Sequence, residues 1–179
     1  MRHETSEKAS VKVLEGGITF ENFYLKPYVT EEISDSVKQA NILLIPHERF
    51  RAEHDYLFPE ITLEFFSYLQ ANLPDGIKAD IGVSDSQFKA IELHSSVINI
   101  PNLLVETFAL GLVVNLLSSW LYDILKSKHK RDKDFGVKVQ IIAEDRTSNK
   151  TTTITYEGEA AQCGEALKDI VEKLCQGRV

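Results

Sequence analysis

The feature that most constrains this chain is a stretch, residues 107–122, without a single charged side chain. Its leucine, valine, phenylalanine and tryptophan content predicts one long helix over residues 102–128. The uncharged run is shorter than the roughly 20 residues that a membrane span needs, and Glu106 and Asp123 close it on both sides. We therefore expect a central helix buried against a sheet. The basic residues that follow suit the negative end of a helix dipole: Lys126, Lys128, His129, Lys130, Arg131 and Lys133.

A stripe of small and polar residues runs along the predicted long helix. Its members recur every four positions, which places them on one helix face: Thr107, Gly111, Asn115, Ser119 and Asp123. Small side chains let two helix backbones approach closely, so the stripe predicts a helix–helix seam across a dimer axis. The alternative is a face that packs against the protein's own sheet or meets water.

The rest of the chain alternates between strand and helix patterns. β-Branched and aromatic residues predict strands at 11–14, 18–29, 41–46, 77–83 and 88–100, and a hairpin at 137–144 and 151–156. Apolar residues at helical spacing predict helices at 30–40, 59–72 and 159–176. The order predicts an α/β fold: a mixed sheet with helices packed on it, with the long central helix followed by an antiparallel hairpin and a C-terminal helix.

A length of 179 residues suits one domain. We expect a flexible leader at 1–10 and a single α/β domain at 11–179, with a candidate helix–hairpin–helix subdomain at 101–179. The polar N-terminus lacks the apolar core of a secretory signal. Cys163 and Cys175 lie too far apart along one helix to form a disulfide. Both observations favour the cytoplasm.

A dense polar segment follows the apolar strand at 41–46. Open α/β sheets bind ligands beyond the carboxyl ends of their strands, so this position suggests a ligand pocket. The spacing of the two histidines does not match a helical zinc motif, and the arginines fit a phosphate or carboxylate group better than a cation. The alternative is a solvated connection. The candidate ligand-binding residues are His47, Glu48, Arg49, Arg51, His54 and Asp55.

The composition disfavours several function classes. A net charge of −7 disfavours a general nucleic-acid binder, which needs a cationic surface. A metal-dependent nuclease needs acidic residues followed by a strand with Glu-x-Lys. Glu92 lies on such a strand with Asp80 and Asp85 nearby, but His94 stands where the lysine is needed, which disfavours this class. The glycine-rich phosphate loop, the nucleophile elbow and the dinucleotide-binding turn are absent from the sequence.

These observations favour a non-catalytic interaction or regulatory module that associates with itself or with a protein partner. Its binding surface would be built on the long helix and the C-terminal hairpin. The alternative is a small enzyme or ligand-binding protein that holds a phosphorylated or carboxylated molecule at residues 47–55. We expect a homo-oligomer with no metal or cofactor, without general nucleic-acid binding and without a membrane as the partner.

Overall fold

The computed structural model describes residues 9–48, 56–92, 96–127 and 135–177. A seven-stranded mixed sheet forms the centre, in the order β1-β9-β8-β7-β2-β4, and β6 also pairs with β8. Its strands are β1 (Ser10–Glu15), β2 (Ile42–Ile45), β4 (Ala79–Ile81), β6 (Val97–Asn99), β7 (Asn102–Glu106), β8 (Gly136–Asp145) and β9 (Lys150–Glu159). A separate small sheet pairs β3 (Phe58–Pro59) with β5 (Ala90–Ile91). The predicted mixed α/β fold is confirmed.

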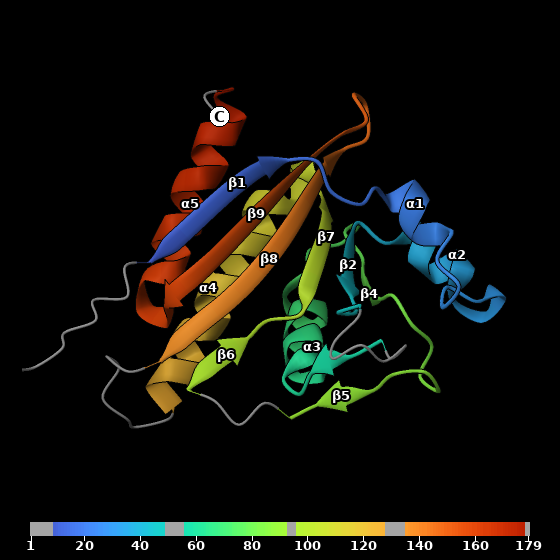
Figure 1. Cartoon of the computed structure of the whole chain (residues 1–179), viewed down its shortest axis with the longest axis horizontal. Helices are drawn as coiled ribbons and strands as arrows, with labels where there is room; N and C mark the ends of the chain where they lie inside the picture. Colours follow the sequence, from blue (N-terminus) through green and yellow to red (C-terminus); the bar gives the residue numbers. More distant parts are fainter. Residues whose placement is uncertain (1–8, 49–55, 93–95, 128–134, 178–179) are drawn as a thin grey trace, which may run out of the picture.

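Helices cover one face of the sheet. Figure 1 shows α4 (Leu110–Ser127) and α5 (Ala160–Cys175) behind β8 and β9, with α3 (Thr62–Asn72) beside α4. The Phe65 ring of α3 lies 4.9 Å from the Trp120 ring of α4, which joins these two helices. α1 (Phe20–Tyr24) and α2 (Glu31–Gln39) lie toward the β4 side of the sheet.

The predicted buried strand at 41–46 is β2. All four of its residues are buried, because β7 and β4 flank it and side chains cover both of its faces. The predicted hairpin is β8 and β9, and the predicted helices at 30–40 and 159–176 are α2 and α5. In these segments the apolar period matched the side of the element that became buried.

The strand predicted at 18–29 is wrong. This segment forms α1 and a turn, and its aromatic residues Phe20, Phe23 and Tyr28 are all buried. Thr19 starts the helix, since its side-chain oxygen accepts the Asn22 amide at 3.1 Å. The aromatic residues therefore indicate that this segment is buried, whereas the Thr19 cap favours a helix over a strand.

The predicted long helix begins too early. Residues 102–106 form β7, and the 3-10 helix η2 (Thr107–Ala109) separates this strand from α4. Leu103, Leu104 and Val105 are fully buried between β2 and β8. An uncharged apolar run of this kind is compatible with a buried strand as well as with a buried helix. The strand predicted at 88–100 is also wrong as one unit, because β5 and β6 are separate strands in different sheets. Pro59 lies in β3 rather than in the first turn of α3.

Candidate functional site

One side of α4 is buried, and the opposite side is exposed and uncharged up to Tyr122, where Asp123 ends the uncharged stretch. The buried side consists of Leu110, Val113, Val114, Leu117, Trp120, Leu121 and Ile124. The exposed side carries Asn115, Ser119 and Tyr122, and Thr107 and Phe108 of η2 extend it toward the N-terminus. Phe108 and Tyr122 are large side chains with 66% and 65% of their surface exposed. We call these five residues the uncharged α4 face.

The structure places most of the predicted stripe on this exposed side. Thr107, Asn115, Ser119 and Asp123 are exposed, and Gly111 is half-buried. A Cβ atom at Gly111 would lie 4.0 Å from Val171 of α5. The stripe therefore does not pack against the sheet within one chain. Whether it forms the predicted seam stays a prediction.

A close approach between two helices of this layer lies beside the stripe. A Cβ atom built on Gly164 of α5 would lie 2.7 Å from the hydroxyl oxygen of Ser118 in α4. Ser118 turns that hydroxyl to the Val114 carbonyl oxygen at 2.7 Å. Small residues do permit a close helix contact here, but the contact joins α4 to α5. The sequence analysis predicted close helix packing along the stripe instead, from Thr107 through Gly111, Asn115 and Ser119 to Asp123.

The neighbouring helix α5 shows that an uncharged face is not general in this protein. Its exposed positions carry charges of both signs: Glu165, Lys168, Asp169, Glu172 and Lys173. Lys173 and Asp169 form an ion pair at 2.8 Å. Charged residues are typical of helix surfaces that remain in water. The two helices therefore present chemically different surfaces on the same side of the molecule.

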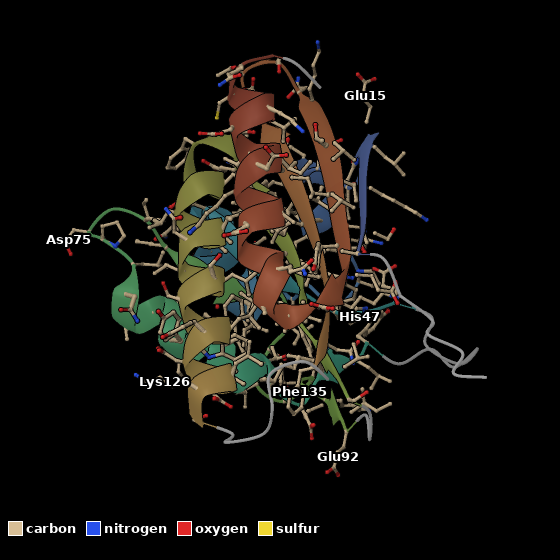
Figure 2. The ribbon with its side chains drawn as sticks, turned by 90° about the vertical axis from the view of Figure 1, so that its left-hand side faces the viewer. Glu15, His47, Asp75, Glu92, Lys126 and Phe135 are labelled. Carbon is tan, nitrogen blue, oxygen red and sulfur yellow. The ribbon has the colours of Figure 1, made fainter. Side chains whose placement is uncertain are left out.

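A groove of about 490 Å³ runs between α4 and α5. Leu121, Tyr122 and Leu125 line it from α4, and Gly164 lines it from α5. Charged side chains stand at its rim, among them Lys126, Glu165 and Lys168. Figure 2 shows the two helices side by side, with Lys126 near the C-terminal end of α4.

Residues 107–127 form a helical segment that is long and apolar enough to cross a membrane by length and composition alone. Half of that segment is buried inside the fold, against the sheet and the neighbouring helices. Core helices of soluble proteins pass the same test, so this segment is weak evidence for a membrane.

The second predicted site begins at His47, just after β2. The His47 backbone pairs with Leu57, and its ring Nδ1 atom lies 3.4 Å from the Asn102 side-chain nitrogen. Burial lowers the pKa of His47, and the nearby Lys138 ammonium lowers it further. His47 is therefore held as a neutral ring near pH 7. In Figure 2, His47 and Lys126 lie on opposite sides of the molecule, so this region is distinct from the α4–α5 groove.

Glu48 is committed to structural contacts. Its carboxylate pairs with the Lys26 ammonium at 2.8 Å and accepts the Tyr28 hydroxyl at 2.8 Å. Burial and this hydrogen bond raise the pKa of Tyr28. Arg49, Arg51, His54 and Asp55 lie outside the described residues, as does His94. The ligand-binding hypothesis for residues 47–55 therefore stays a prediction.

The depressed pKa of His47 predicts how stability changes with pH. The unfolded chain protonates this ring near pH 6.5, whereas the folded protein resists protonation until a lower pH. The unfolded state thus binds more protons between these two pKa values, so the free energy of unfolding should fall as pH drops from 7 toward 5. Urea unfolding at stepped pH measures this slope. His47→Asn should flatten it over that window, and an unchanged slope would contradict the assignment.

A polar cluster that the sequence analysis missed surrounds the buried Glu144, where β7 and β8 end. Glu144 is only 3% exposed, and its Oε2 atom accepts the Phe20 amide at 2.6 Å. Arg146 pairs with Glu106 at 2.9 Å, donates to the Tyr24 hydroxyl at 2.8 Å and stacks on the Phe20 ring. Because these contacts join residues of α1 to the ends of β7 and β8, the cluster holds α1 against the sheet. Only the position of Glu144 at the end of an apolar strand hinted at it.

The described residues contain no group of three or more histidine, cysteine, aspartate or glutamate side chains that could hold a metal ion. Cys163 and Cys175 are both free thiols. Burial raises the pKa of Cys163 to about 12, so this thiol is inert at neutral pH. Comparison with protein-family models, with curated proteins and with solved structures finds no match to this chain.

Proposed function

We propose that this protein is a non-catalytic interaction module whose copies associate through the uncharged α4 face. The observation that carries the proposal is the exposure of Phe108, Asn115, Ser119 and Tyr122 on a helix side that carries no charge before Asp123. Exposed aromatic residues are enriched at the centres of protein interfaces, and charged residues are depleted there. The charged face of α5 makes the contrast local to α4.

The stripe is symmetric about Asn115, which favours a two-fold partner. If two α4 helices pack antiparallel with Asn115 on the axis, Gly111 faces Ser119 of the second copy and Thr107 faces Asp123. Phe108 then meets Tyr122 of the second copy, so an aromatic pair closes each end. The two Asn115 amides can each donate and accept a hydrogen bond across the axis. Isologous contacts of this kind are the commonest in homo-oligomers.

A disulfide scan tests this arrangement in a Cys175→Ser background, which removes the exposed native thiol. Asn115→Cys alone should cross-link to its own copy, because a residue on the axis faces itself within disulfide reach. Ser119→Cys and Gly111→Cys should each cross-link poorly alone and efficiently when mixed. Equal cross-linking by all three single variants would contradict the proposed register.

Asn115→Lys provides the matching disruption. It places two like charges at the axis, which costs several kcal/mol and should weaken association about 100-fold. Sedimentation velocity across a concentration series measures this effect. Gln70→Lys, at an exposed position of α3, controls for added charge. A wild-type chain that remains monomeric at every concentration, or an Asn115→Lys variant that associates normally, would refute the proposal.

A further inference from the structure

The sheet ends at β1 with backbone groups that face outward. Among the described strands only β9 pairs with β1, in antiparallel register. The Gly16 amide donates to the Thr151 carbonyl at 2.8 Å, so Gly16 and Thr151 form a hydrogen-bonded pair. Such pairs alternate along an antiparallel ladder. The N–H and C=O groups of Val11, Val13 and Glu15 therefore point away from β9, toward the free edge.

This edge carries apolar side chains that edge strands usually avoid. Leu14 is 63% exposed and Val11 is 37% exposed, and every β1 residue except the half-buried Val13 is exposed. The opposite edge of the sheet differs, because α2 and α3 both pack against β4. A long exposed edge with apolar side chains is a template for pairing with another strand.

The adjacent helix α5 is covered at one end and left partly bare at the other. Its sheet-facing residues Cys163 and Leu167 are fully buried, whereas Ile170 and Leu174, one and two turns further on, are only half-buried. Figure 1 shows the reason: the C-terminal half of α5 extends beyond the outer side of β1. One more strand beside β1 would lie against this half and cover Ile170 and Leu174.

We propose that the β1 edge and the C-terminal half of α5 bind one extended segment of a protein partner, antiparallel to β1. Val11, Val13 and Glu15 share the sheet face that α5 covers, so the residues opposite Val11 and Val13 would be apolar. The opposite face calls for an acidic residue across from Lys12 and an apolar residue across from Leu14. A basic residue across from Glu15 completes the pattern. This surface is separate from the uncharged α4 face.

The β1 strand of a second copy fits this edge less well. Pairing around Val13 sets Lys12 against Leu14 of the copy and Glu15 against Val11, so each charge faces an apolar residue. Pairing around Lys12 sets two lysines directly opposite each other, which is destabilising. Two isologous contacts on one chain, the α4 seam and a β1–β1 contact, would also join copies into an open-ended assembly unless their axes form a closed ring. This last argument alone rests on the proposed function.

A synthetic peptide tests the pattern directly. The probe is fluorescein-labelled Lys-Leu-Val-Glu-Val-Thr, whose residues lie opposite Glu15 through Ser10 in that order. Its third residue, opposite Val13, points its N–H at β1, and its fourth residue, opposite Lys12, points its N–H away. N-methylation of the third residue should therefore weaken binding about tenfold, and N-methylation of the fourth should change it little. Fluorescence anisotropy measures all three peptides on the wild-type chain.

A protein variant supplies the reciprocal test. Val13→Pro removes an outward N–H and changes the half-buried side chain, but it removes no N–H that points to β9. Its pairing with β9 should therefore survive, whereas its affinity for the peptide should fall about tenfold. Circular dichroism checks that the variant is folded. Peptide binding is also measured on Asn115→Lys, so that failure of the α4 seam and failure of this proposal are separable.

The peptide and variant experiments have three distinguishable outcomes. Discrimination between the two N-methylated peptides, with loss in Val13→Pro, supports the proposal. Absence of saturable binding by the unmodified peptide, or binding that ignores the methylated position, overturns it. If Val13→Pro instead lowers the oligomeric state of the chain, the edge joins two copies and the assignment to a partner protein is wrong.

Discussion

Gly82→Ala should be among the most destabilising single changes in this chain. Gly82 is buried just after β4, and a Cβ atom there would lie 2.9 Å from Cε1 of Phe23 and nearer still to its Cζ atom. The Phe23 ring is itself fully buried and packs edge-on against Tyr28. We expect a loss of about 3 kcal/mol in the free energy of unfolding, because overpacked cores relax poorly. Urea denaturation should show it, with a melting temperature lower by roughly 10 °C.

Two further variants isolate the cause of that loss. Phe23→Leu replaces the ring with a shorter aliphatic side chain, so the double variant with Gly82→Ala should lose at least 1 kcal/mol less than the two single losses combined. Gly111→Ala is the matched glycine control for packing within one chain, because its new Cβ atom meets nothing in the same chain nearer than 4.0 Å. It lies in a helix and should gain up to about 1 kcal/mol. Equal losses at Gly82 and Gly111 would show that the Phe23 contact is not the cause.

The parts of the fold that the sequence predicts are those where a local period determines which side is buried. α2 keeps Val37 buried between the exposed Ser36 and Lys38, and α5 repeats its buried residues at helical spacing. In β8 and β9 the alternation places Val139 opposite Tyr156 on the helix-covered face. In each case one element carries enough pattern to specify its own conformation.

The parts that fail depend on contacts from distant residues. The segment at 18–29 looks like a strand because its aromatic residues are close together. Its helical conformation depends on Glu144, more than a hundred residues later, which accepts the Phe20 amide. Residues 102–106 have no feature that separates a buried strand from the start of a buried helix. Neighbours on both sides, β2 and β8, decide that they pair.

The candidate surface could be half predicted. The four-residue spacing correctly grouped Asn115, Ser119 and Asp123 on one side of α4, because helical geometry fixes that. The sequence did not reveal that this side would face away from the sheet, since small polar residues suit either environment. The exposed Phe108 was missed because aromatic residues are usually read as core. The free edge of β1 follows from strand order, which no local pattern encodes.

Glu144→Ala should cost about 2 to 3 kcal/mol of folding free energy, because it leaves the buried Phe20 amide without an acceptor. α1 is only five residues long and cannot sustain itself. Thr19 caps the Asn22 amide, and Glu144 accepts the Phe20 amide from the end of β8. Removing the carboxylate should therefore release α1 first, with faster hydrogen exchange at Phe20 and lower urea stability overall.

Glu144→Gln separates the hydrogen bond from the charge. It keeps an acceptor oxygen and nearly the same volume, so its loss should be smaller than that of Glu144→Ala. Glu157→Ala removes an exposed carboxylate on the neighbouring strand β9 and should change stability by no more than about 0.5 kcal/mol. Equal urea stability of Glu144→Ala and Glu157→Ala, with unchanged exchange at Phe20, would show that Glu144 is not the acceptor that holds α1. In that case the helix would be anchored by Arg146 alone, through its contacts with Glu106, Tyr24 and Phe20.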